Sequence, residues 1–293
     1  MMEVSYDSWL VARIVAAALI GTGLGVTGSM LQRYLNNDLA DPYLLGVSGG
    51  AMLGAVSLGL VVPAAWLVSP FIILLVSLCG SFSFGSLLLL LIIWGRRRLF
   101  SGRAGLVLFG VAVNGFCAAL TMLLMSLEHP LYPRVDYGWL VGRIESYGTY
   151  ETLLLATPIG IGVAIFCSIA GAVERAPYGE FWMRRAGKTP ERVEFLLLVA
   201  VAIIVCTVTA YAGSIGFVGL MVPHIARVFC KSFRSEMMLS AGFGCLLLVG
   251  ADLLAQFVLF PRVLPVGVLT SLTGAAGLAL VLMKRASGGR VYG

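Results

Sequence analysis

The chain has 293 residues, of which 59% are hydrophobic and 12% are charged, and its net charge is +6. Soluble domains carry about a quarter charged residues, so this composition excludes an ordinary soluble protein and predicts an all-α, polytopic bundle of membrane helices. Apolar runs of about 20 residues can cross a bilayer, whereas a β-barrel would alternate over segments of about ten residues. The positive charge does not imply nucleic acid, because membrane proteins concentrate Lys and Arg in cytoplasmic loops.

Hydropathy predicts about nine membrane spans within a single domain that covers residues 1–293. In chain order the spans are 9–33, 43–62, 69–94, 105–127, 150–172, 194–212, 216–230, 237–259 and 266–284. The seventh span is too short and too rich in Gly and Pro for a standard helix facing lipid. We therefore expect this span to pack inside the protein.

The distribution of basic residues orients the spans. Alternating through them places 16 of the 20 Lys and Arg residues on one side, which the positive-inside bias identifies as cytoplasmic. The protein is thus expected in the cytoplasmic membrane of a bacterium or archaeon, with its N terminus outside and its C terminus inside. An outside N terminus without a recognisable signal peptide is unusual, so we expect that a further first helix is missing.

The longest connections lie on opposite sides of the predicted membrane. Segment 128–151, outside, holds aromatic residues and charges of both signs, and segment 175–194, inside, is rich in charge. Two such loops suggest partners on both faces. In the outer loop, His129 and Tyr132 are compatible with haem ligation or with an ordinary polar boundary. The six cysteines are scattered without a CxxC pair, which favours simple packing roles.

Small and polar residues gather around the first connection. Pairs such as Gly21 and Gly25 have the small-xxx-small spacing that lets helix backbones approach closely in lipid. Asp41 followed by Pro42 predicts the cap and first position of a helix. Polar side chains cluster at the end of the first span: Gln32, Asn36, Asn37, Asp38 and Asp41. This cluster is consistent with a tight helix–turn–helix, with a binding point or with a gate.

Three stretches carry a resemblance to a known family. They are Gln32 followed by NDLADPYLLGVSGGA (Asn37 to Ala51), GSIGFVGLMVPHIAR (Gly213 to Arg227) and LPVGVLTSLTGA (Leu264 to Ala275). Their order and sequence resemble the FecCD family of permeases, which belong to binding-protein-dependent ABC importers for iron–siderophores, haem and vitamin B12. The resemblance implies a type II ABC importer permease fold of about nine or ten membrane helices.

The chain departs from the family pattern at several points. The family usually has ten helices, and its Asn-Pro pair reads Asn37-Asp38 here. Of two arginines near the family's N terminus only Arg13 is present, and an arginine after the Ala-Asp motif is replaced by Gln256. These departures concern the helix count and partner docking more than the class of protein.

The resemblance also implies an assembly. Two copies would form the translocation pathway as a homodimer, an extracytoplasmic substrate-binding protein would deliver the substrate, and two cytoplasmic ATPase subunits would drive transport. The chain contains no GxxxxGK[ST] motif, so ATP and Mg would be bound by the ATPase and no cofactor by this chain. The chain itself is expected not to be an enzyme. Iron–siderophore, haem and cobalamin permeases share these motifs, so the sequence does not identify the chelate.

Family positions imply roles for several groups of residues. Coupling to the ATPase, through segment 175–194, is expected of Gly179, Glu180, Arg184, Arg185 and Gly187. A gate or pathway wall is expected of Gln32, Asn37, Ser101, Gly102 and Arg103. Docking of the binding protein is expected of Arg13, and more loosely of the other outside arginines, Arg134, Arg143 and Arg262. The fourth group is a structural motif that forms a packed, broken element: Gly213, Gly216, Gly219, Pro223, His224 and Arg227.

Two intramembrane polar residues need an explanation of their own. Asp252 lies in an apolar span and is costly to bury, so it is expected to pair with a helix end or an arginine. His224 is expected to make a structural hydrogen bond rather than bind a metal, because no second His or Cys lies at ligand spacing. No metal site is predicted.

Three rival functions remain open. An intramembrane enzyme would need a motif such as HExxH or a serine with a usable base, and the chain has only two histidines. A non-ABC carrier or channel would tend to hold several ionisable residues in mid-membrane, where Asp252 is the main candidate. Permeases for free zinc or manganese ions are related to the FecCD family but match the NDLADP pattern less well.

Overall fold

The computed structural model describes residues 6–62, 69–98, 103–127, 137–145, 148–185, 187–258 and 263–288. Within these ranges every regular element is helical, which confirms the predicted all-α class. Nine helices correspond one by one to the nine predicted spans: α1 (Tyr6–Leu35), α2 (Val47–Val61), α3 (Pro70–Arg98), α4 (Arg103–Ser126), α6 (Thr149–Val173), α8 (Pro190–Ala212), α9 (Val218–Phe229), α10 (Phe233–Phe257) and α11 (Val266–Gly288).

Six of these helices contain an apolar stretch long enough to cross a membrane, and shorter apolar stretches lie in α2, α9 and α11. The 12 residues of α9 span about 18 Å, which is well short of a hydrocarbon core of about 30 Å. The prediction that the seventh span is too short for a standard lipid-facing helix is therefore confirmed. Within the described ranges there are also four minor helices: η1 (Pro42–Leu45), α5 (Tyr137–Leu140), η3 (Ala176–Tyr178) and α7 (Glu180–Arg184).

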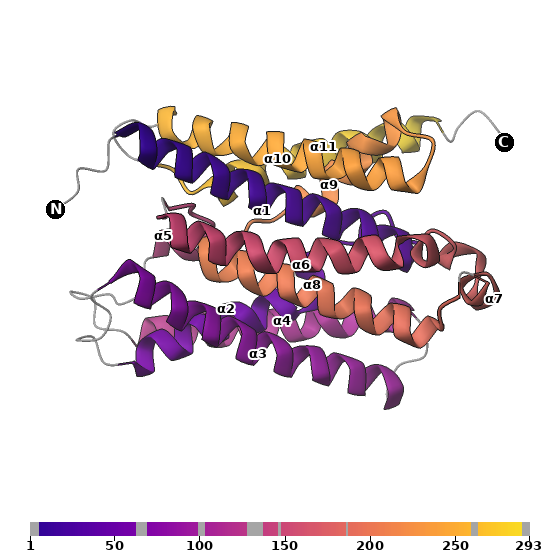
Figure 1. Cartoon of the computed structure of the whole chain (residues 1–293), viewed down its shortest axis with the longest axis horizontal. Helices are drawn as coiled ribbons and strands as arrows, with labels where there is room; N and C mark the ends of the chain where they lie inside the picture. Colours follow the sequence, from indigo (N-terminus) through magenta and orange to yellow (C-terminus); the bar gives the residue numbers. More distant parts are fainter. Residues whose placement is uncertain are drawn as a thin grey trace.

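The long helices run roughly parallel across the molecule (Figure 1). One end of the bundle carries α7 and the other carries α5, and α1 begins at the α5 end while α11 finishes at the α7 end. The ends of the chain thus lie at opposite ends of the bundle, as an odd number of spans requires. By the distribution of basic residues, the α7 end is the cytoplasmic end.

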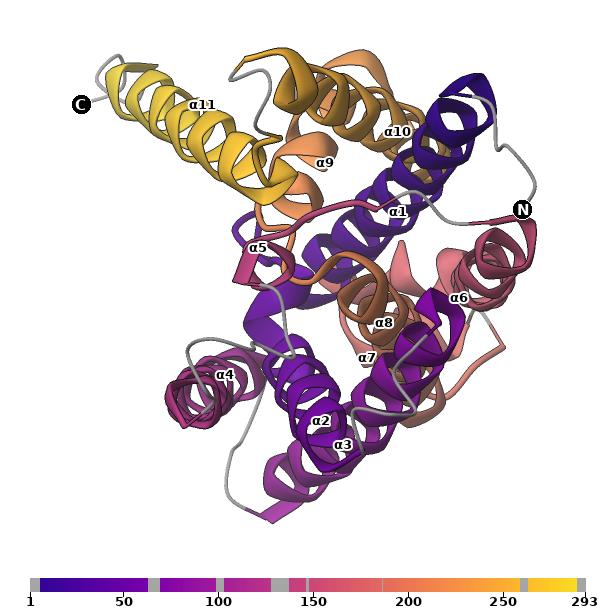
Figure 2. The same cartoon turned by 90° about the vertical axis from the view of Figure 1, so that its left-hand side faces the viewer.

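Seen along its length, the bundle has a covered centre, with α4 and α11 at its edge (Figure 2). Helix α8 lies among α1, α2, α3 and α6, and 78% of its apolar window is buried. Helices α4 and α11 stand at the edge, and only 17% of the α4 window is buried. Most of the α4 window is therefore not buried in this single chain.

Glycines set the closest helix contacts. A methyl group on Gly21 or Gly25 of α1 would collide with the backbone of α10, at the carbonyls of Gly244 and Ser240. This confirms that the small residues of the first span serve close packing. Helices α2 and α3 approach in the same way at Gly54 and Gly80.

Candidate functional site

The motif Gly213–Arg227 begins with a break between α8 and α9. Gly213 ends α8 with φ 66° and ψ −146°, a conformation that is essentially restricted to glycine, and Phe217 precedes α9 with φ 68°. The break is packed on both sides: Ser214 Oγ donates to the carbonyl of Leu140 at 3.1 Å, and the Ile215 N–H donates to the Tyr43 hydroxyl at 3.0 Å. The predicted packed, broken element is therefore confirmed.

The first and second motifs meet at the start of α9. A side chain at Gly219 would collide with the ring of Pro42, and one at Gly28 of α1 would collide with the backbone of Gly219. Only a residue without a Cβ lets α1, η1 and α9 converge here. The connection that contains Pro42 is thus held against α9.

Asp41 caps η1 as the sequence predicts. Its Oδ1 accepts a hydrogen bond from the Tyr43 N–H at 2.8 Å, and Pro42 occupies the first helical position. Burial raises the pKa of this carboxyl to about 6, although the Tyr43 hydrogen bond acts in the opposite direction. Next in the chain, Gly46 takes φ 85° and lies against the backbone of Gly110 in α4. The connection therefore links α1 to α4.

The motif ends at Arg227, whose guanidinium joins three other segments of the chain. Its Nη2 donates to Gln32 Oε1 of α1 at 2.7 Å, and its Nη1 donates to Asp38 Oδ1 at 2.6 Å. Its Nε donates to Glu236 Oε1 of α10 at 2.8 Å. We call this group of four side chains the Arg227 hub. A planar guanidinium with donors in fixed directions suits such a junction.

Gln32 extends the hub into the backbone. It is almost fully buried, and its Nε2 lies 3.1 Å from the carbonyl of Leu220 and 3.3 Å from those of Ala40 and Gly219. Its amide oxygen accepts from Arg227, so both ends of the amide are used. Gln32 thus binds the first connection to α9.

The remaining predicted gate residues are placed as follows. Asn37 is exposed in the turn after α1, where its N–H donates to the carbonyl of Gln32 at 3.1 Å and its Oδ1 accepts from the Leu39 N–H at 3.0 Å. Arg103 is the first residue of α4. Ser101 and Gly102 lie outside the described residues.

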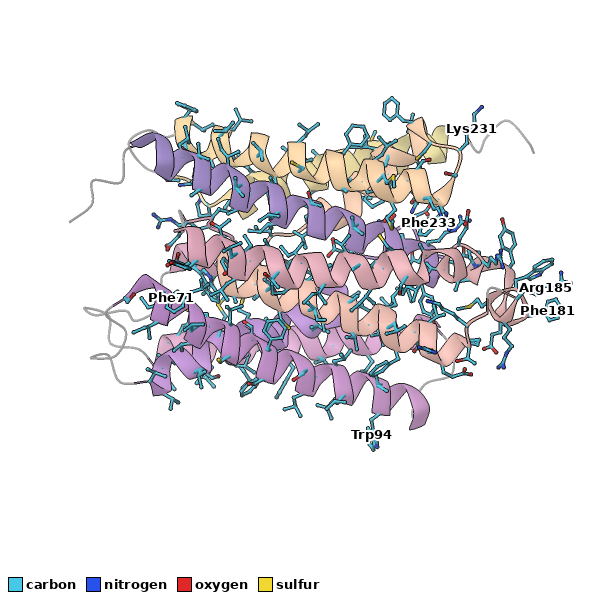
Figure 3. All side chains as sticks on the ribbon, viewed as in Figure 1. Phe71, Trp94, Phe181, Arg185, Lys231 and Phe233 are labelled. Atoms are coloured by element: carbon cyan, nitrogen blue, oxygen red, sulfur yellow. The ribbon has the colours of Figure 1, made fainter. Side chains whose placement is uncertain are left out.

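The predicted coupling segment forms a short projection at the cytoplasmic end (Figure 3). Gly179 precedes α7 with φ 102°, Glu180 begins the helix, and Gly187 follows it with φ 76°. Both glycines therefore adopt positive φ, which other residues rarely do. Between them, α7 is anchored by Met183, whose side chain is fully buried.

The outer surface of α7 is aromatic and basic. Phe181 and Trp182 are 65% and 45% exposed, and their rings meet edge to face with centroids 5.9 Å apart. The Arg185 guanidinium lies 5.6 Å from the first ring and 5.5 Å from the second (Figure 3). Arg184 lies 3.9 Å from Glu191, and both side chains are exposed. Such an exposed aromatic pair beside an arginine resembles the anchors of protein interfaces.

Arg13 does not lie where a docking residue is expected. Arg13 is 4% exposed, and its guanidinium forms two hydrogen bonds of 2.8 Å with the carboxylate of Asp252 in α10. Gln256 Nε2 donates to the same carboxylate at 3.1 Å. The prediction that Asp252 pairs with an arginine is confirmed. A buried, fully engaged Arg13 cannot also meet a binding protein in this conformation, so its docking role is replaced by a structural one.

The other outside arginines are less defined. Arg143 lies after α5 and is half-buried. Arg134 and Arg262 lie outside the described residues, as do His129 and Tyr132 of the outer loop. Their predicted roles remain predictions.

His224 makes the expected structural contact. Its Nδ1 lies 3.2 Å from the carbonyl of Leu220, one turn earlier in α9, and Pro223 stands next to it inside the helix. Among the described residues, no group of three His, Cys, Asp or Glu side chains could hold a metal ion.

Sequence reasoning missed several polar contacts. Glu236 completes the hub, and Glu194 of α8 accepts a hydrogen bond from the Tyr34 hydroxyl at 2.7 Å. Ser48 of α2 lies 3.3 Å from Asn114 Oδ1 of α4. A signal was available for the glutamates, because a carboxylate beside an apolar run has to find a partner.

Comparison with known proteins shows which protein family this chain is similar to. Residues 4–284 match the model of the FecCD transport family. The chain is 37% identical over 274 residues to the vitamin B12 import system permease protein BtuC of Vibrio cholerae, covering 93% of this chain and 80% of that protein. It is 31% identical over 294 residues to the hemin transport system permease protein HmuU of Yersinia pestis, covering 97% and 85%.

A solved structure shares the fold. A transporter assigned to the metal-chelate ABC type, in an inward-facing conformation, superimposes with a TM-score of 0.80 at 22% identity, covering 94% of this chain and 85% of that one. Together with the membrane-spanning helices, the family match across the chain establishes its class. The chain belongs to the FecCD transport family, as a multi-pass permease of the cytoplasmic membrane.

Proposed function

We propose that this chain is the permease subunit of an ABC importer and forms, as a homodimer, the pathway for a metal chelate such as an iron–siderophore, haem or cobalamin. The observation that carries the proposal is the α7 projection. Its exposed Phe181 and Trp182 meet edge to face, and the Arg185 guanidinium lies 5.6 and 5.5 Å from their ring centroids. Exposed aromatics that are already ordered bind a partner at low entropic cost.

The partner at α7 is a cytoplasmic ATPase subunit, one for each permease copy. Transport against a gradient needs an energy source, and the chain has no GxxxxGK[ST] motif with which to bind ATP. ATP and Mg would therefore be bound by the ATPase, and this chain would not be an enzyme. Glu180, Arg184 and Arg185 would meet polar groups at the rim of the ATPase groove, and Gly179 and Gly187 allow the turns that present α7.

The second copy would cover the open flank formed by α4 and α11. Large apolar side chains on this flank are exposed in the single chain, including Leu108, Phe116 and Met122 of α4 and Leu272 of α11. In a homodimer these faces would line the two-fold axis or contact the other copy. Ser101, Gly102 and Arg103, at the cytoplasmic start of α4, would form the gate.

An extracytoplasmic binding protein would deliver the chelate to the α5 end. Arg143 after α5, together with Arg134 and Arg262, would supply positive charge to acidic residues on that protein. Complementary charges of this kind mainly set orientation and association rate. Arg13 is not included, because it is paired with Asp252 inside the bundle.

The experiment is reconstitution of the purified permease in lipid vesicles with the ATPase and binding protein from the same source. We expect ATP-dependent uptake of a chelate together with stimulation of ATP hydrolysis by the loaded binding protein. The absorption spectrum of the ligand in the co-purified binding protein would distinguish haem, corrinoid and ferric siderophore. Uptake of free zinc or manganese ions alone would favour the alternative permease class, and uptake without the ATPase would contradict the proposal.

A further inference from the structure

The first connection carries an acidic side chain that reaches the Arg227 hub. Asp38 follows Asn37 in the turn after α1, and its Oδ1 accepts from Arg227 Nη1 at 2.6 Å. The Asp38 contact therefore joins the first connection to the Arg227 hub.

The two carboxylates of the hub differ in exposure. The side chain of Glu236 is 8% exposed, whereas that of Asp38 is 42% exposed and Arg227 lies between them at 27%. Exposed ion pairs are weakened by water and salt, while a buried partner is costly to separate. Glu236 and Gln32 thus hold Arg227 in place, and Asp38 is the partner that can open.

The residues that follow Asp38 contact α4, the long helix whose apolar window is the least buried. Pro42 rests on Gly219 of α9, and Gly46 lies against the backbone of Gly110 in α4. One turn further along α4, Asn114 Oδ1 lies 3.3 Å from the Ser48 Oγ. Because these contacts are close, a shift of the connection would move α4 with it.

We propose that Asp38 is a positioning residue: its contact with Arg227 is a releasable electrostatic latch that holds residues 36–46, and with them α4, against the α9–α10 hairpin. With the latch closed, α4 keeps its position relative to the hub. With the latch open, residues 36–46 remain tethered through Gln32 but move more, and α4 moves with them. The importance of this shift for transport rests on the proposed function, whereas the latch itself is a property of the chain alone.

Hydrogen–deuterium exchange on the purified full-length permease in lipid nanodiscs tests the latch without any partner protein. In Asp38→Asn, which is nearly isosteric, we expect the amides of residues 36–46 and 105–113 to exchange about two- to fivefold faster, as loss of one part-exposed ion pair implies. High salt should increase the exchange rate of the wild-type protein in the same segments. It should not change the exchange rate of Asp38→Asn there.

Two controls separate the latch from general instability. Asp38→Glu keeps the charge and should retain wild-type exchange and its salt dependence. The amides of central α8, residues 194–212, should exchange equally in all variants. Equal exchange of wild type and Asp38→Asn in residues 36–46 at low salt would overturn the proposal. Faster exchange in residues 36–46 with unchanged exchange in 105–113 would overturn the link to α4.

Discussion

Arg13 and Asp252 form a two-pronged ion pair inside the bundle, with both hydrogen bonds at 2.8 Å, although they are 239 residues apart in the chain. The pair joins the first long helix to α10 near the end opposite α7. Gln256, one turn after Asp252, donates to the same carboxylate. The pair therefore helps to close the bundle between segments from the two ends of the sequence.

Removing one partner of this pair should destabilise the protein strongly. Arg13→Ala would leave the Asp252 carboxylate buried without its cation, which costs about 3–5 kcal/mol in comparable pairs. Reversible unfolding in detergent should show this loss. Arg192→Ala, at an exposed position of α8, should change stability by less than about 0.5 kcal/mol. The combined change Arg13→Met and Asp252→Leu should recover most of the loss, and failure to recover it would argue against an uncompensated charge as the cause.

Arg227 should not tolerate lysine. A lysine ammonium is a point charge on a flexible stem and cannot reproduce three donors aimed at Gln32, Asp38 and Glu236. At least one buried acceptor would lose its partner, so Arg227→Lys should cost about 1–3 kcal/mol in unfolding free energy. The matched change in the opposite direction, Lys231→Arg at an exposed position, should leave the unfolding free energy unchanged. Equal stability of Arg227→Lys and wild type would show that the positive charge alone, and not the directed hydrogen bonds of the guanidinium, stabilises the fold.

Two glycines of one motif should respond differently to alanine. Gly213 has a backbone conformation closed to other residues, and a Cβ there would collide with the carbonyl of Trp139. A Cβ on Gly216 would have Ser271 Oγ at 3.8 Å as its nearest neighbour. Gly213→Ala should therefore lose about 1–3 kcal/mol or fail to yield monodisperse protein, whereas Gly216→Ala should purify normally. The measurement is size-exclusion chromatography followed by thermal unfolding, and similar behaviour of both variants would contradict the strained break.

Removing the aromatic tip of α7 should uncouple the transporter without unfolding it. Phe181 and Trp182 are exposed, so truncating both to alanine should leave the melting temperature of the isolated permease unchanged. In the reconstituted importer we expect at least about a tenfold loss of uptake, the scale of one or two interface anchors. Phe195→Ala, which removes an exposed ring from α8, is the matched control and should transport normally. Normal uptake by the doubly truncated variant would remove α7 from the ATPase interface.

Much of the helix layout was predictable from local properties of the chain. Each apolar run of sufficient length forms a helix because backbone groups in lipid have to be satisfied internally. The seventh span was predicted to be too short for lipid because its glycines and Pro223 interrupt it, and α9 is indeed a 12-residue helix. Asp41 and Pro42 predicted the start of η1 because capping depends only on neighbouring residues.

The candidate site was only partly predictable. Gln32, His224 and Arg227 were singled out from their motifs, but no local signal connected them to Glu236 or showed that Asp38 reaches Arg227. Arg13 was assigned to docking at the outer surface because it matches an arginine of the family pattern, and the structure buries it instead.

The sequence by itself therefore determined the class of protein, the number and type of its membrane helices in the described chain, and the places where their backbone breaks. Only the tertiary structure decided which charges pair, because Arg13 finds Asp252 and Arg227 finds Asp38 through helix contacts between distant segments. Those contacts are set by close backbone approaches, such as Gly21 with Gly244 and Gly28 with Gly219. Hydropathy and spacing report what each helix is, whereas the pairing of helices depends on shapes that meet only after folding.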